Sequence, residues 1–376
     1  MSVKYLKNFD MRPRFLVPAA LLCCLFMSCN NRVDSLEIMT SQLDSLFNPI
    51  FPAKDPGAAI LLLKGNDIIY ERYLGLATLE PDTPVNENTF FCIASVSKQF
   101  SAVALMKLAQ EGKLSLDDSV SKYFPQFKAP FFQRITLRHL LSHTSGIPDS
   151  RPRTDSNYVY YSTDVESYSY LDTVTRLNFE PGTQYEYMNP TFQLMYTIIE
   201  KASGKPFEEY MRTEIFDPAG MEKSVYFEDG RFIPNMSHGY EWNAQASRWD
   251  ECDYGETSFF ASKADGGLYT SPREFVQWEF ALRRHLFLNE EMTAMAHSGK
   301  IDTDLPYTQY GYGWFIEHKP GYPVKVFHTG DNGGYQIHEE RFPNEEVLFL
   351  IFSTRNIDRE GTVEKVDALL QKAGLI

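Results

Sequence analysis

The chain has 376 residues, 43% of them hydrophobic and 23% charged, an ordinary composition for one large or two modest globular domains. Its formal net charge is −14 at pH 7. Because an acidic chain has no electrostatic attraction to nucleic acid or to anionic lipid, the charge argues against nucleic acid as a partner.

Residues 1–28 have the pattern of a secretory signal peptide: a basic start, an apolar run over 15–27 and then the small residue Ser28. The run is too short for an ordinary membrane-spanning helix. Cys29 directly after a small residue also resembles the lipobox of bacterial lipoproteins, where the chain is cut before a cysteine whose thiol carries lipid. We therefore expect a bacterial cell-envelope lipoprotein, in the periplasm or outer membrane, anchored through Cys29. An ordinary cleaved signal is the alternative.

The next part of the chain predicts a helix followed by a β-hairpin. Apolar residues recur at helical spacing within residues 30–50. An apolar run over 57–63, a turn at 64–67 and a second extended run over 68–73 indicate two paired strands. A long helix with a broad apolar stripe is then predicted over 95–110.

Strands return only near the C-terminus, after a stretch from 113 to 230 that is predicted to hold mainly helices and loops. A helix is expected over 268–284. Three short runs at 324–328, 335–341 and 347–354 then indicate an antiparallel meander. A closing helix is predicted over 360–373.

Strands at both chain ends around a helical middle predict an α+β fold, with an antiparallel sheet flanked by helices and an all-helical insertion lobe. We expect residues 29–376 to form a single domain. Its sheet lobe would comprise about 35–98 and 231–376, and its helical lobe about 99–230. Such an arrangement places a substrate cleft between the two lobes.

Ser95-Val96-Ser97-Lys98 is an SxxK motif, whose first and last residues share one face of a helix. The Lys98 amine can then reach the Ser95 hydroxyl, and the positive end of the helix dipole stabilises developing negative charge there. The motif is weak alone, because Ser119-Val120-Ser121-Lys122 repeats the same four letters. That second copy lies between acidic residues and a proline, with no helix predicted to hold it. We therefore interpret Ser119 as a solvated turn residue.

Two further motifs follow in order, Tyr187-Met188-Asn189 and His328-Thr329-Gly330, the latter predicted to end the first strand of the meander. Longer segments at 137–149, 198–207 and 266–271 fit the same pattern. Together, from about residue 35 to the end, the chain resembles the family of class C β-lactamases, DD-peptidases and esterases, the penicillin-recognising serine hydrolases. The resemblance implies a β-lactamase/transpeptidase-like fold.

The resemblance also implies residue roles. Ser95 would attack a carbonyl and form an acyl-enzyme, while Lys98 and Tyr187 would share the general-base work, with pKa values depressed by burial and by their neighbours. Which of the two accepts the first proton stays open. The backbone N–H groups of Ser95 and Asp331 would form the oxyanion hole. The resemblance assigns substrate binding to Asn189, His328, Thr329 and Gly330, the glycine allowing close approach of the backbone.

One departure from the family pattern bears on the substrate. Classical class C β-lactamases have lysine where this chain has His328, and histidine is mostly neutral at neutral pH. We therefore expect a peptidase, carboxypeptidase or esterase for D-amino-acid compounds rather than an efficient β-lactamase. The alternatives are a true β-lactamase and a sensor that is acylated by penicillin, or binds peptide, without turnover.

Histidines four residues apart, His139 and His143, are the one pair on a predicted helix that could bind a metal ion. No HExxH pattern surrounds them, so we interpret them as scaffold and expect no metal or other cofactor. The expected partners are a D-amino-acid peptide, an ester or a β-lactam, together with the membrane. The oligomeric state stays open.

Overall fold

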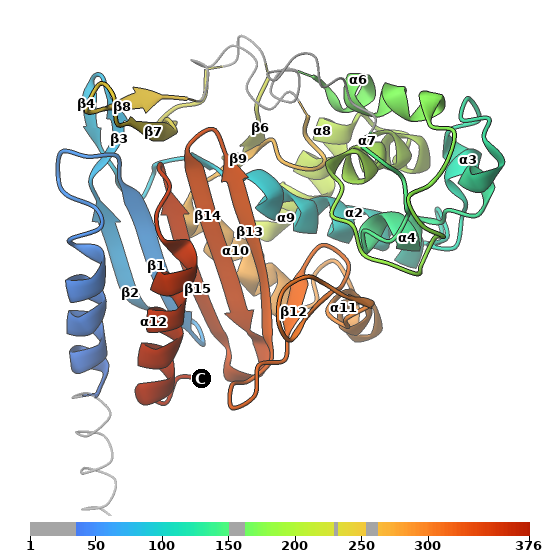
Figure 1. Cartoon of the computed structure of the whole chain (residues 1–376). Coiled ribbons are helices and arrows are strands. Elements are labelled where there is room, and N and C mark those ends of the chain that lie inside the picture. Colours follow the sequence, from blue (N-terminus) through green and yellow to red (C-terminus); the bar gives the residue numbers. More distant parts are fainter. Residues whose placement is uncertain (1–34, 150–161, 229–231, 253–261) are drawn as a thin grey trace, which may run out of the picture.

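The computed structural model describes residues 35–149, 162–228, 232–252 and 262–376. Its centre is an eight-stranded sheet in which every neighbouring pair runs antiparallel. In spatial order the strands are β10 (Ile301–Asp302), β11 (Thr308–Tyr310), β12 (Phe315–Glu317), β13 (Lys325–Asn332), β14 (Tyr335–Phe342), β15 (Val347–Ser353), β1 (Ala58–Lys64) and β2 (Asp67–Leu74). The sheet and the helices packed around it confirm the predicted α+β fold (Figure 1).

The central strands are apolar on both sides because both faces of the sheet are covered. Along β1, Ile60 and Leu62 face one core, whereas Leu61 and Leu63 face the other. Such a strand reads as a continuous apolar run rather than an alternating one. The first core lies under the N-terminal helix at 35–47 and α12 (Arg359–Lys372), which stand side by side in Figure 1.

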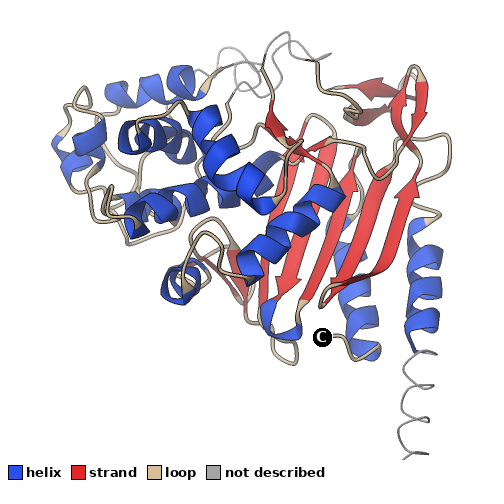
Figure 2. Ribbon diagram, turned by 180° about the vertical axis from the view of Figure 1, so that it is seen from behind, coloured by secondary structure: helices blue, strands red, loops and turns tan. Residues whose placement is uncertain are grey.

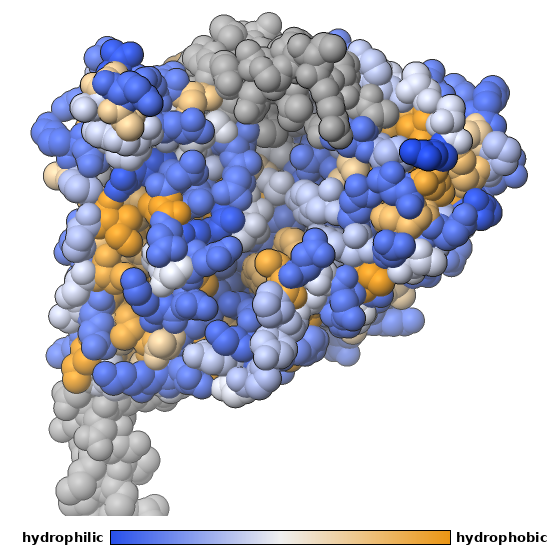
Figure 3. Space-filling view, viewed as in Figure 1, coloured by the Kyte–Doolittle hydropathy of each residue, from blue (hydrophilic) through white to orange (hydrophobic). Residues whose placement is uncertain are grey.

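An apolar band is visible on the face that carries these two helices (Figure 3). Partly buried side chains such as Leu36, Ile69 and Leu369 pack against the core beneath them. Among the described residues, no helix is long and apolar enough to cross a membrane.

The opposite face of the sheet packs against α10 (Pro272–Arg283) and, beyond it, the helical part of the molecule (Figure 2). α2 (Lys98–Gln110) runs from the sheet into this part and is buried along most of its length. The other helices and helical turns described are α3 (Val120–Tyr123), η2 (Pro130–Gln133), α4 (Leu137–Leu141), α6 (Asp164–Ser169), η3 (Tyr170–Thr173), α7 (Asn189–Ser203), α8 (Phe207–Met211), the π-helical turn η4 (Arg212–Phe216), α9 (Asp217–Ala219), α11 (Glu290–Ala296) and η6 (Pro343–Glu345).

Three small sheets complete the fold: β3 (Leu76–Leu79) with β4 (Asp82–Pro84), β7 (Tyr240–Asn243) with β8 (Arg248–Glu251), and β5 (Phe91–Cys92) with β9 (Leu268–Thr270) and β6 (Val225–Tyr226). The last of these matters for the site. β5 leads directly into the turn that carries Ser95, and β9 pairs with it.

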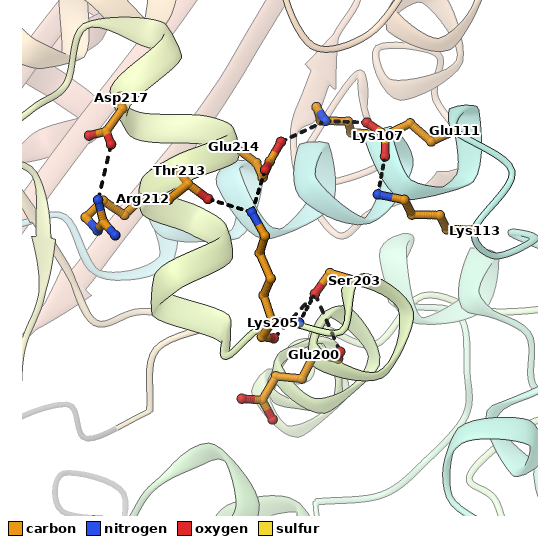
Figure 4. Close-up of polar contacts among 10 residues, drawn as sticks. All are labelled: Lys107, Glu111, Lys113, Glu200, Ser203, Lys205, Arg212, Thr213, Glu214 and Asp217. Atoms are coloured by element: carbon orange, nitrogen blue, oxygen red, sulfur yellow. Dashed lines mark hydrogen bonds and ion pairs between the residues drawn. The ribbon is translucent and has the colours of Figure 1, made fainter.

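Polar contacts hold the far end of α2 against the end of α7 (Figure 4). Lys205, just beyond the α7 C-cap, donates to the Glu214 carboxylate at 2.8 Å and to the Thr213 hydroxyl at 3.2 Å. Glu214 in turn lies 3.5 Å from the ammonium group of Lys107 on α2. Helix α2 is therefore tied to the helical part at one end and to the sheet at the other, which fixes the position of its first residue, Lys98.

Candidate active site

The candidate nucleophile Ser95 lies on a strained turn rather than in a regular α-helix. The chain leaves β5, passes Ala94 in the left-handed region at φ 46°, and forms the 3₁₀ turn η1 (Ala94–Ser97) before α2 begins at Lys98. Residues 95–110 are therefore helical as predicted, but the first turn is a 3₁₀ turn and the α-helix begins only at Lys98. In a 3₁₀ turn, side chains three residues apart eclipse each other, which places the Lys98 amine over the Ser95 hydroxyl.

Lys98 is fully buried, and its amine contacts Ser95 directly. Its Nζ lies 3.0 Å from Ser95 Oγ and 2.9 Å from the backbone carbonyl oxygen of Asp265. The same Nζ is 5.0 Å from the centre of the Tyr187 ring and 5.7 Å from that of Phe192. A hydroxyl, a carbonyl and two ring faces thus surround the amine.

Tyr187 precedes α7 and is half-buried in the same site, with its hydroxyl group buried. Burial raises the pKa of Tyr187 well above its ordinary value, although the neighbouring Ser95 hydroxyl acts in the opposite direction. The prediction of a depressed pKa was therefore wrong for this residue, because removing a phenolate from water costs more than its polar neighbours return. At rest, Tyr187 is a neutral phenol that can both donate and accept a hydrogen bond.

Asn189 begins α7, two residues after Tyr187, and its side chain faces the same cavity. Its Oδ1 is buried and has no hydrogen-bond partner among the described residues. A buried amide oxygen of this kind is costly unless a donor reaches it. The atom is therefore available to an N–H group of a bound substrate.

His328 is held as a neutral imidazole of one tautomer. Its Nδ1 lies 2.7 Å from the carbonyl oxygen of Thr329, which can only accept, so the proton is on Nδ1. Nε2, at 3.1 Å from the Tyr310 hydroxyl, then accepts from it. Burial first, and then the Lys98 charge, lower the pKa of His328 to about 3. The residue therefore adds no positive charge to the site at neutral pH.

The His328-Thr329-Gly330 motif lies within β13, which continues to Asn332, so the prediction that the motif ends its strand was wrong. A Cβ at Gly330 would lie 2.4 Å from the carbonyl oxygen of Ile93, closer than real Cβ contacts. The glycine thus lets β13 lie directly against the turn that carries Ser95. Asp331 follows immediately and lines the same cavity as Ser95, as an oxyanion hole made by these two residues would require.

The cavity over Ser95 has a volume of about 480 Å³. Its walls come from the Ser95 turn, the segment that leads into α7, the loop between β10 and β11, and the strands β12 and β13. The lining residues are Ser95, Tyr185, Tyr187, Asn189, Thr303, Asp304, Leu305, Phe315, His328, Thr329 and Asp331. Ser95, Tyr187, Asn189, His328, Thr329 and Asp331 were singled out from the sequence. The other lining residues were not, since they belong to none of the recognised motifs: Tyr185, Thr303, Asp304, Leu305 and Phe315.

His143 was interpreted as scaffold, yet it lies against Tyr187. It follows the C-terminal end of α4 with φ 54°, so the prediction that it shares a helix with His139 was wrong. Its ring centre is 4.3 Å from that of Tyr187, and its Nδ1 accepts the Met188 N–H at 3.1 Å. Burial first, and then the Lys98 charge, keep the pKa of His143 well below its ordinary value. The residue is a neutral, buried support for the Tyr187 segment.

The remaining predicted residues lie elsewhere. Ser119 is the N-cap residue of α3, which holds the rest of the second tetrad, and none of the four residues lines the cavity. Cys29 and the signal peptide fall outside the described residues. Within the described ranges, no group of three or more His, Cys, Asp or Glu side chains could hold a metal ion.

Proteins with known names are similar to this chain in sequence and in fold. The chain is 27% identical over 332 residues to penicillin-binding protein 4* of Bacillus subtilis strain 168, covering 85% of this chain and 72% of that protein. It is 30% identical over 194 residues to a D-aminopeptidase of Gluconobacter oxydans, but spans only 36% of that protein's length. A penicillin-binding protein from Bacillus halodurans superposes with a TM-score of 0.76 at 28% identity, over 87% of this chain and 98% of that one.

The fold is also similar to that of D-amino acid amidase from Ochrobactrum anthropi SV3, with a TM-score of 0.73 at 22% identity over 91% of this chain and 98% of that one. The sequence also matches the Beta-lactamase family over residues 50–373, a range that includes every candidate site residue described above. The chain is therefore an enzyme of the beta-lactamase family of serine hydrolases.

Proposed function

We propose that the mature chain is an exported hydrolase that forms an acyl-enzyme at Ser95 from D-amino-acid peptides, amides or esters. The observation that carries this proposal is the contact of the Lys98 amine with the Ser95 hydroxyl at 3.0 Å, at the base of a 480 Å³ cavity. A serine is a weak nucleophile unless a neighbouring group takes its proton. Here a buried amine and a buried phenol flank the same hydroxyl.

In the proposed reaction, Ser95 Oγ attacks the substrate carbonyl while its proton passes to Lys98 or Tyr187. The negative charge on the former carbonyl oxygen is stabilised by the backbone N–H groups of Ser95 and Asp331, where one donor is worth roughly 2.7–4 kcal/mol. The protonated partner then delivers its proton to the leaving amine or alcohol. Water, activated by the same groups, attacks the acyl-enzyme and releases the acid. Asn189 holds the amide or ester groups of the substrate.

The state of His328 supports peptides, amides and esters over β-lactams as substrates. A neutral imidazole whose Nδ1–H is already donated to a carbonyl offers no charge to the carboxylate of a penicillin. The name of one relative, a D-aminopeptidase, fits this preference. For the location, we propose the bacterial cell envelope, with residues 1–28 removed and Cys29 carrying lipid.

Intact mass measured over time with a fluorescent penicillin and a p-nitrophenyl ester tests the proposal. We expect a mass increase that maps to Ser95, turnover of the ester, and slow release of the hydrolysed penicillin. Rapid penicillin release would make the chain a β-lactamase despite His328. A stable adduct without turnover of either compound would identify a sensor, and no adduct with no ester product would overturn the proposed chemistry.

A further inference from the structure

The charges that line the cavity are unevenly neutralised. Asp331 is paired with Arg359 at the start of α12, whose Nη1 lies 2.8 and 2.9 Å from the two carboxylate oxygens. His328 is neutral, and the Lys98 amine is engaged behind Ser95. Among the described residues, no lysine or arginine lines the cavity. Asp304 is therefore the one cavity-lining carboxylate to which no basic side chain of the described residues is paired.

Asp304 lies in the loop between β10 and β11, where its side chain is exposed to solvent at the cavity. Thr303 and Leu305, on either side of it, line the same cavity. Its charge acts on Tyr185 of the facing wall, whose pKa is raised first by burial and then by Asp304. The carboxylate thus faces the space that a substrate occupies, beside the apolar side chains of Leu305 and Phe315.

We propose that Asp304 binds the free α-ammonium group of the acyl part of the substrate, so that the enzyme prefers D-amino-acid amides and peptides with an unblocked amino terminus. This inference rests on the proposed hydrolysis at Ser95 and sharpens it, because it separates aminopeptidase or amidase substrates from those recognised by a carboxylate. Within the described part of the cavity, an ammonium group meets an unpaired carboxylate, whereas a carboxylate meets no lysine or arginine. Charge complementarity of this kind selects among ligands more than it adds affinity.

The test compares D-phenylalanine p-nitroanilide with its N-acetyl derivative, which lacks the positive charge. Asp304→Asn should lower kcat/KM for the free amine about tenfold and change that for the acetylated compound less than about twofold. Asp304→Lys should lower kcat/KM for the free amine further and leave the acetylated compound as the better substrate. Asp302→Asn is the matched control, since this neighbour is exposed, accepts from Gln309 at 2.9 Å and does not line the cavity. It should alter neither value.

Equal loss on both compounds, or no loss on the free amine, would overturn the role of Asp304. Failure of the proposed function is detected separately, as wild-type enzyme that hydrolyses neither p-nitroanilide nor p-nitrophenyl acetate. In that case, the role of Asp304 is tested by measuring, with calorimetry, the affinity of the Ser95→Ala variant for D-phenylalanine amide. Binding that weakens about tenfold with the added Asp304→Asn change supports the ammonium site, and unchanged binding removes it.

Discussion

The same four residues, Ser-Val-Ser-Lys, occur twice within 28 positions and do different things. In the first copy, at 95–98, the lysine is fully buried and its amine lies 3.0 Å from the serine hydroxyl. In the second, at 119–122, Ser119 is the extended N-cap residue of α3, and the Lys122 amine turns to the Asp118 carboxylate at 2.7 Å. The side chain of Lys122 is 55% exposed.

The difference is set by what surrounds each copy, not by the spacing within it. A short helix does form at the second copy, contrary to our prediction, so helical geometry alone does not bring lysine to serine. An aspartate one residue before Ser119 provides a better partner for the ammonium group. The first copy has buried apolar strands before it, β13 across from it and Tyr187 above it. A catalytic SxxK motif is therefore a property of the packed site.

The largest expected effect is at the two serines. Ser95→Ala should abolish covalent labelling by penicillin and reduce ester turnover by at least about 10³-fold, because no other group can form the acyl-enzyme. Ser119→Ala should leave both unchanged within about twofold. Intact mass and steady-state kinetics measure the two effects. The reverse result would mean that the second copy is the nucleophile, and that the contact between Lys98 and Ser95 is merely structural.

The second test compares the lysines of the two copies, Lys98 and Lys122. Lys98→Met keeps an apolar chain of similar length but removes the amine, and should slow acylation about 10²- to 10⁴-fold, the range of general acid–base catalysis. Lys122→Met removes an ion pair whose lysine side chain is 55% exposed, and should cost no more than about 1 kcal/mol of stability with unchanged kinetics. Pre-steady-state ester kinetics and thermal unfolding give both quantities. Comparable slowing in the two variants would erase the distinction between the copies.

Much of the fold was readable from the sequence because the central strands and long helices carry strong periodic or continuous apolar patterns. The hairpin of β1 and β2, the meander of β13 to β15 and the helices α10 and α12 were all predicted near their observed positions. Local backbone detail was not. The left-handed Ala94 and the 3₁₀ turn that begins with it lie against β13, and an apolar pattern contains no sign of either.

The site was predicted unevenly for a similar reason. Motif order identified residues that carry chemistry in the whole family, such as Ser95 and Tyr187. It did not identify His143, whose position depends on a turn that brings α4 beneath the Tyr187 segment, or Asp304, which a loop brings to the cavity. Burial also reversed the predicted pKa shift of Tyr187, and burial is known only once neighbouring elements are placed.

His143, which lies against Tyr187 beside the first copy, provides the third test. His143→Phe keeps a ring against Tyr187 but leaves the Met188 N–H without its acceptor, a loss of roughly 1–3 kcal/mol for a buried donor. We expect kcat to fall about tenfold, with recovery in His143→Asn if its oxygen reaches the same N–H. The imidazole is neutral at neutral pH, so the pH profile of kcat should keep its shape. Loss of one limb of that profile would instead make His143 a proton-transfer group.

The smallest expected effect concerns the charge on β13 next to the first copy. His328→Lys should raise the rate of acylation by a carboxylate-bearing penicillin, relative to an uncharged ester, by roughly five- to tenfold, since it adds a cation where the wild type has none. The ratio cancels any general damage from the lost hydrogen bond to Tyr310. In the wild type, a pKa of about 3 keeps His328 neutral from about pH 5 to about pH 8, so the same ratio should be flat there. Protonation would add positive charge and raise the ratio only as the pH falls toward 3. A wild-type ratio that already rises between about pH 7.5 and about pH 6 would show a histidine titrating near its ordinary pKa, and the preference for uncharged substrates would then need another cause.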